Sequence, residues 1–142
     1  MLSTFNRNEA FHTVVDKLPE KRKQVYLAIK EKGRATALEI SLHFMKPINE
    51  VTGRITELKE LCLIKESGSS KNNYTRCNNT LYSVCSDEER IDLINSKYQD
   101  LIDRRDALVN DYNLNLSDYT KEYLVKQISS IDSKINKLKE IQ

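Results

Sequence analysis

The chain has 142 residues, of which 39% are hydrophobic and 31% charged, with a formal net charge of +2. This length suits one compact domain, or a small domain with a helical extension. Three glycines and two prolines are too few for the tight turns of a β-sandwich or barrel. The sequence has no apolar run near the roughly 20 residues of a membrane span and no secretory signal pattern. We therefore expect a cytoplasmic protein without a membrane partner.

The charge is distributed unevenly along the chain. Residues 1–85 hold 14 Lys/Arg and 9 Asp/Glu, giving +5, whereas residues 86–142 hold 9 Lys/Arg and 12 Asp/Glu, giving −3. Such segregation indicates that the first segment contacts a polyanion and the second does not.

The three cysteines, Cys62, Cys77 and Cys85, are odd in number and show no CxxC spacing. Reduced thiols are the default for a cytoplasmic protein, so no disulfide framework is expected. A zinc site that also uses His43 is the alternative, but no ligand spacing supports it. We expect no metal and no cofactor.

The first third of the chain predicts three helices. Residues 6–17 place Phe11, Val14, Val15 and Leu18 on one face. A second helix opens near Pro19 and ends at Gly33, and its expected buried stripe is Val25, Leu27, Ala28 and Ile29. Thr36 and Glu39 have the spacing of a capping box, which predicts a short, mostly buried helix over 36–44.

A further helix follows Lys46 and begins at Pro47. At 100° per residue its apolar side gathers Ile48, Val51, Ile55, Leu58 and Cys62. The opposite side carries Asn49, Gly53 and Thr56, with Thr52 and Lys59 on one flank. A glycine inside a helix costs about 1 kcal/mol relative to alanine, so we expect a compensating reason for Gly53.

Two extended runs, "LCLIKES" and "TLYSVC", enclose the polar stretch "GSSKNNYTRCNN" and predict a β-hairpin with a long tip. From Ser86, which has capping-box spacing to Glu89, two heptad stripes of about 24 residues follow. They are joined by a polar loop, and Ser117 or Asp118 can cap the second helix. The pattern describes either a helical hairpin or two packed dimer helices.

Helix, short helix, turn, helix and hairpin together resemble the winged helix-turn-helix DNA-binding superfamily. In "VTGRITELKELCLI", Val51, Thr52, Leu58, Leu63 and Ile64 match the recognition helix and following strand of MarR-type regulators and related phage or mobile-element proteins. Cys62 stands where that pattern has glycine. The resemblance covers about residues 19–85. It implies a mainly α fold with a small β-hairpin wing (α+β), followed by a two-helix antiparallel coiled-coil-like hairpin.

The resemblance implies a DNA-binding domain over 1–85 and a hairpin over 86–142 for dimerisation or higher oligomerisation. The expected partner is double-stranded DNA, read in the major groove by helix 47–61 and contacted by wing 68–80. The expected DNA-binding residues are Arg34, Lys46, Asn49, Thr52, Gly53, Arg54, Thr56, Lys59, Lys71, Asn72, Asn73 and Arg76. The expected dimerisation residues are Ile94, Leu101, Leu108, Leu124, Ile128, Ile131, Ile135 and Leu138.

The leading interpretation is a dimeric, sequence-specific transcription regulator, in particular a repressor. One alternative is a phage or plasmid DNA-binding accessory protein for replication, partition or packaging. Another is a protein–protein adaptor that uses the winged helix as an interaction module. The sequence has two histidines, no nucleophile elbow and no phosphate-cradling glycine loop, so we do not expect an enzyme.

Overall fold

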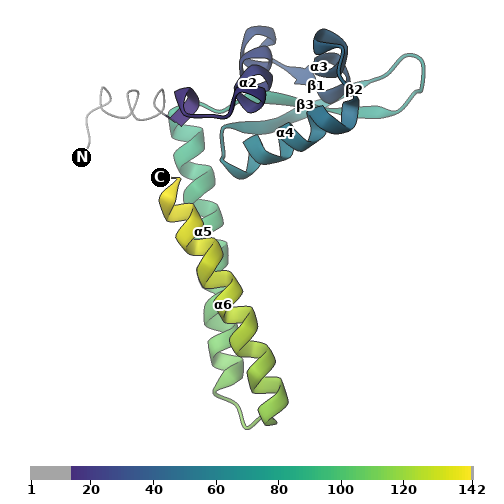
Figure 1. The fold of residues 1–142 in the computed structure, drawn as a ribbon. Helices are drawn as coiled ribbons and strands as arrows, with labels where there is room; N and C mark the ends of the chain where they lie inside the picture. Colours follow the sequence, from purple (N-terminus) through teal and green to yellow (C-terminus); the bar gives the residue numbers. More distant parts are fainter. Residues whose placement is uncertain (1–13, 142) are drawn as a thin grey trace. The chain divides into compact units, whose positions relative to one another are not determined.

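The structure is a computed structural model that describes residues 14–141 (Figure 1). The expected helix over 6–17 therefore falls mostly outside the described residues, although residues 14–16 are helical. The contacts divide the chain into two compact units, the first ending at Arg90 and the second beginning at Ile91.

The first unit consists of helices around a small antiparallel sheet (Figure 1). Its elements are, in chain order, α2 (Glu20–Lys32), β1 (Ala35–Thr36), α3 (Ala37–Phe44), α4 (Ile48–Glu60), β2 (Ile64–Lys71) and β3 (Asn78–Val84). The strand order is β1-β3-β2, with both pairings antiparallel. This element order is that of a winged helix-turn-helix, so the predicted α+β fold class is confirmed. The third strand, β1, was not predicted, because two residues are too short to show an alternating pattern.

The helix ends follow the capping signals in the sequence. Gly33 ends α2 with φ 76°. The capping box at the start of α3 is formed in both directions: Glu39 N–H donates to Thr36 Oγ1, and Thr36 N–H donates to the Glu39 carboxylate, each at 3.2 Å. Both features support the predicted boundaries of α2 and α3.

The end of α4 keeps the geometry for which a glycine is usual. Cys62 adopts φ 58°, its N–H donates to the Lys59 oxygen at 3.0 Å, and Leu63 N–H donates to the Leu58 oxygen at 3.1 Å. This pair of hydrogen bonds is a Schellman motif, and both leucine side chains are fully buried. The cysteine therefore does not abolish the cap, although the left-handed conformation is unfavourable for a residue with a Cβ.

The core of the first unit is apolar and continuous across the helices and the sheet. Its members are Val15, Val25, Tyr26, Ile29, Ala35, Ile40, Val51, Ile55, Leu58, Leu63 and Ile64. Two predicted core residues are wrong: Leu27 is 45% exposed and Ile48 is 48% exposed. Leu27 lies on the opposite side of α2 from Val25, and Ile48 begins α4 at the edge of its apolar stripe.

The wing has longer strands and a shorter tip than predicted. β2 pairs with β3 from Ile64↔Val84 to Lys71↔Asn78, with an irregularity between Glu66 and Ser69. The loop is therefore residues 72–77. The outer parts of both strands are polar on both faces, so no alternation in the sequence marked them as strands.

The second unit is an antiparallel helical hairpin formed by α5 (Asp87–Tyr112) and α6 (Asp118–Glu140), which lie side by side in Figure 1. The first four residues of α5 belong to the first unit. Ser117 caps α6, because its hydroxyl accepts from Thr120 N–H at 3.3 Å. Arg105 Nε pairs with Asp132 at 2.7 Å and links the two helices.

The heptad residues of the hairpin are covered to different extents within a single chain. Ile94, Leu124, Ile135 and Leu138 are buried, whereas Leu101, Leu108, Ile128 and Ile131 are half-buried. These residues thus pack within one antiparallel hairpin, the arrangement predicted from the sequence, and their expected role in dimerisation stays a prediction. No helix in the described part of the chain is long and apolar enough to cross a membrane.

Candidate nucleic-acid interface

Helix α4 is anchored on one side and open on the other. Val51, Ile55 and Leu58 are 3%, 2% and 0% exposed and fix the helix against the core. On the opposite side Asn49 and Thr52 are exposed. The polar flank predicted from the sequence is therefore a solvent-facing surface.

The same surface continues through Gly53 and Thr56. Thr56 is exposed and Gly53 is half-exposed. A Cβ added at Gly53 would meet no atom within 4 Å outside its own helical turn, and its φ is not positive. Neither packing nor backbone conformation in the described part of the chain requires a glycine here. Together with the Asn49 and Thr52 surface, these residues form the slender face of α4.

The polar groups of the slender face are partly engaged by their own helix. Thr52 Oγ1 donates to the Asn49 oxygen and Thr56 Oγ1 to the Thr52 oxygen, each at 3.0 Å. Asn49 Oδ1 accepts from Glu50 N–H at 3.0 Å. The threonine hydroxyls retain acceptor lone pairs, and their second Cβ branch is a methyl group. With their hydroxyl hydrogens directed at the helix backbone, these threonines can accept hydrogen bonds from a partner or contact it through the methyl group, but they do not donate to it.

Two predicted DNA-contacting cations form ion pairs within the protein. Arg54 Nη1 lies 3.2 Å from the Glu57 carboxylate, which also accepts from Arg22 Nε at 2.6 Å. Lys59 Nζ lies 2.7 Å from the Glu66 carboxylate. The Arg22–Glu57 pair ties α4 to α2 and the Lys59–Glu66 pair ties it to the wing strand β2, whereas the Arg54–Glu57 pair lies within α4.

Arg34 and Lys46 lie outside α4. Arg34 Nη2 donates to the Ser67 oxygen, in the irregular part of β2. A Cβ on Gly68, which has φ 121°, would lie 2.7 Å from the same Arg34 nitrogen, so the glycine permits this contact. Lys46 is exposed and directly precedes the N-cap residue Pro47.

The wing tip presents Lys71, Asn73 and Arg76 to solvent. Asn72, also predicted as a contact, has a structural role in the tip, because its Oδ1 accepts from Tyr74 N–H at 2.8 Å and from Thr75 N–H at 3.2 Å. Sequence reasoning missed Tyr74, whose side chain is 98% exposed. The signal was an aromatic residue inside an otherwise polar loop.

Cys85, which directly follows β3, lies in surroundings that disfavour the ionisation of its thiol. Burial raises the pKa of Cys85 to about 11, with the Glu89 carboxylate adding to the effect. Burial also raises the pKa of Tyr26 to about 12. Cys62 and Cys85 are buried free thiols, and no group of three or more His, Cys, Asp or Glu in the described residues is arranged for a metal ion.

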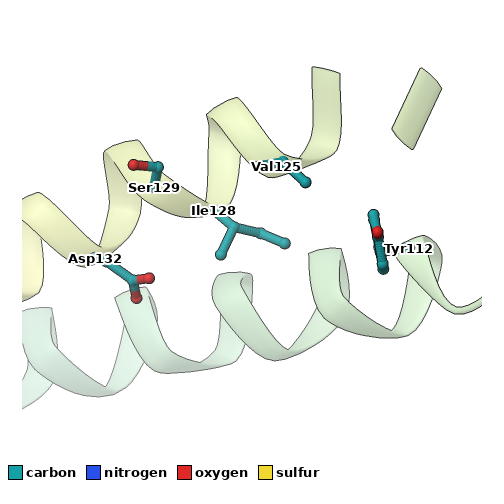
Figure 2. Close-up of a pocket in the computed structure, with 5 residues that line it drawn as sticks. All are labelled: Tyr112, Val125, Ile128, Ser129 and Asp132. Carbon is teal, nitrogen blue, oxygen red and sulfur yellow. The ribbon is translucent and has the colours of Figure 1, made fainter. Parts of the chain in front are cut away.

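The helical hairpin carries two shallow pockets on the groove between α5 and α6. One, of about 290 Å³, is lined by Tyr112, Val125, Ile128, Ser129 and Asp132, and Figure 2 shows these side chains. The other, of about 400 Å³, is lined by Tyr98, Ile102, Arg105, Asp132, Ile135, Asn136 and Lys139. Both meet at Asp132. Val125 is 50% exposed, so the groove has apolar surface open to solvent.

Comparisons with known proteins give distant structural similarities only. No family model matches the chain, and no curated protein does. A possible transcriptional regulator from Methanosarcina mazei Go1 is similar with a TM-score of 0.44 and 13% identity, covering 75% of this chain and 88% of its own. A mutant ZitR from Lactococcus lactis in apo form has a TM-score of 0.40 and 17% identity, covering 94% and 98%. A further transcriptional regulator has a TM-score of 0.39 and 11% identity, covering 92% and 88%. TM-scores below 0.5 at these identities identify no family for this chain.

Proposed function

We propose that this protein binds double-stranded DNA and regulates transcription, with the slender face of α4 in the major groove. The observation that carries the proposal is Gly53, which the fold does not need and which lies on an exposed face braced from behind by Val51, Ile55 and Leu58. A groove about 12 Å wide admits a helix, and small side chains let its backbone approach the base edges closely.

The start of α4 adds groups suited to phosphate. The first turn of a helix has N–H groups without helical partners and a partial positive charge, and Lys46 is exposed just before it. Phosphate contacts of this kind fix the position of the helix on the duplex, whereas Asn49, Thr52 and Thr56 face the bases. The Asn49 amide group is the clearest hydrogen-bond donor of this set.

The wing supplies the second contact. Lys71 and Arg76 stand at the two ends of the tip and are exposed. They reach phosphates beside the groove that α4 occupies, while Arg34 contacts the irregular middle part of β2 through the Ser67 oxygen. Wing contacts of this type contribute mainly sequence-independent affinity.

We further propose that the hairpin joins two copies of the chain. The exposed Val125 and the half-buried Ile102 and Ile128 line the two pockets of the groove, and covering them removes apolar surface from water. We expect such a twofold dimer to read a palindromic site, whose half-sites present successive major-groove faces about 34 Å apart.

In vitro selection of bound duplexes from a random pool, followed by fluorescence anisotropy, tests the proposal. We expect a selected duplex to bind at least about a thousandfold more tightly than a random one at physiological salt. Alanine at Lys71 or Arg76 should weaken binding to all duplexes and reduce the salt slope by about 0.9 per lost phosphate contact. Lys126→Ala on the hairpin, 73% exposed, is the matched control and should change neither quantity.

An adaptor function is the second candidate, because the hairpin also exposes Tyr119 (83%) and Tyr123 (56%) and tyrosine is enriched in protein interfaces. That function predicts no duplex binding even at low salt, together with partner binding abolished by Tyr123→Ala. The mass of the DNA complex separates a dimeric regulator from a ring-forming replication or packaging accessory.

A further inference from the structure

The wing tip, residues 72–77, is a turn folded by its own hydrogen bonds. Asn72 N–H donates to the Cys77 oxygen and its backbone oxygen accepts from Arg76 N–H, both at 2.9 Å. Its Oδ1 also accepts from the backbone N–H groups of Tyr74 and Thr75. A single side chain and its peptide groups thus hold the two residues at the apex in place.

The side chain presented at that apex is Tyr74, which is 98% exposed. The other tyrosine of the wing, Tyr82, is half-buried. The Lys59 Nζ atom lies over its ring, 6.0 Å from the ring centroid. Tyr74 makes no such contribution to the fold. A rigid turn that holds an aromatic ring in water is a feature of binding surfaces, where tyrosine provides apolar area and one hydrogen-bonding group.

The charges beside Tyr74 indicate the kind of partner. Lys71, the last residue of β2, and Arg76 are exposed on either side of Tyr74 along the chain, and residues 71–77 include no acidic residue. A flat ring between two cations matches a slot bordered by two rows of phosphates, and the duplex minor groove, about 6 Å wide, is such a slot.

We propose that Tyr74 enters the DNA minor groove and that its phenol O–H donates to the adenine N3 or thymine O2 acceptors on the groove floor. This inference rests on the proposed duplex binding and makes Tyr74 a specificity-determining residue. A G·C pair places the guanine N2 amino group at the same position. That group is a donor that cannot accept from the phenol and occupies its space, so the wing favours A·T pairs.

Single-stranded DNA is the competing nucleic-acid partner. Proteins that bind it use several aromatic side chains on which successive bases stack. The wing tip offers one aromatic ring, in keeping with a groove contact to duplex rather than a stacking platform.

The test uses the full chain and a duplex selected from a random pool. Each A·T pair flanking the major-groove site is replaced in turn by G·C and by inosine·C, which lacks only the N2 amino group. For the parent protein we expect G·C at the Tyr74 position to weaken binding about tenfold and inosine·C to restore it to within about twofold. Tyr74→Ala should bind all three duplexes alike, and Tyr74→Phe should lose most of the discrimination.

Tyr119→Ala on α6 is the matched control, because it removes another highly exposed tyrosine, and it should keep the parent's discrimination. Equal parent affinity for the A·T, G·C and inosine·C duplexes would overturn the role of Tyr74 and leave duplex binding intact. Discrimination retained by Tyr74→Ala, or tighter binding to single strands than to duplex, would also overturn it. Failure of the parent to prefer any selected duplex over random DNA would overturn both proposals.

Discussion

The hydroxyl group of Thr52 donates a hydrogen bond to the backbone oxygen of Asn49, one turn earlier in α4, at 3.0 Å. The hydroxyl hydrogen is thus directed at the helix itself, and the methyl group is the branch left for a partner. The same relationship joins Thr56 to Thr52. In the proposed complex, these residues contact bases through methyl groups, which suit the thymine C5-methyl.

This relationship predicts opposite results for two substitutions of Thr52. Valine keeps the methyl and the β-branched shape, so Thr52→Val should bind the selected duplex within about twofold of the parent, whereas Thr52→Ser should bind about fourfold more weakly, the equivalent of one buried methyl group. Fluorescence anisotropy measures both affinities. If serine binds like the parent and valine does not, the hydroxyl rather than the methyl makes the contact.

Gly53→Ala should raise the stability of the fold and weaken its binding to duplex DNA. A Cβ at this position meets no neighbouring atom within 4 Å, so alanine should raise the free energy of unfolding by about 1 kcal/mol through its better helix propensity. The same Cβ stands on the slender face and should weaken duplex binding. Urea denaturation and anisotropy measure the two effects. A gain in stability with unchanged affinity would place the interface elsewhere.

Met45→Gly should stabilise the protein by up to about 1 kcal/mol. Met45 ends α3 with φ 54° and its side chain is 91% exposed, so glycine relieves left-handed strain without loss of packing, partly offset by its backbone entropy. Cys62→Gly is the comparison, because Cys62 has φ 58° but is fully buried. It should stabilise less than Met45→Gly in urea denaturation, and the reverse order would contradict this account of the two caps.

Stability should decline at alkaline pH. The pKa of Cys85 is raised from 9.0 to about 11, mainly by burial. Between these two pH values the folded state retains a proton that the unfolded state releases. Its contribution is complete below about pH 9 and is lost as the pH rises toward 11. Cys85→Ala should flatten the pH dependence of the unfolding free energy over this range. An equally steep decline in the variant would assign the effect to other groups, such as Tyr26.

Val125→Asp should dissociate the proposed dimer without unfolding the hairpin, because Val125 is 50% exposed. Ile131 is a poorer choice, since it is half-buried within the hairpin itself and a charge there disturbs one chain. Analytical ultracentrifugation measures the mass, and circular dichroism checks the helix content. A parent that sediments as a monomer, or a variant of unchanged mass, would reject this interface.

Much of the fold was predictable because its signals are local. The start of α3 was predictable from Thr36 and Glu39, and the end of α2 from Gly33, because the residues that form a helix cap are close together in the sequence. The buried face of α4, formed by Val51, Ile55 and Leu58, was predictable for a similar reason, because apolar residues that recur at helical spacing mark the face that packs on the core.

Other features depend on contacts between distant segments, and the sequence alone did not reveal them. β1 exists because Ala35 pairs with Tyr82, and the sequence of residues 35–36 alone does not predict this pairing. The ion pair of Lys59 depends on Glu66 in β2, a partner that the sequence alone does not place beside α4. The exposure of Tyr74 depends on how Asn72 folds the tip, and tyrosine is as often buried as exposed.

The most direct test of the account is a titration of the ¹⁵N-labelled protein with the selected duplex, followed by NMR. We expect the amide signals of residues 49–56 in α4 and of 72–77 in the wing to shift on binding, while those of α6 stay near their free positions. Shifts confined to α6, or unchanged α4 signals at saturating duplex, would contradict it.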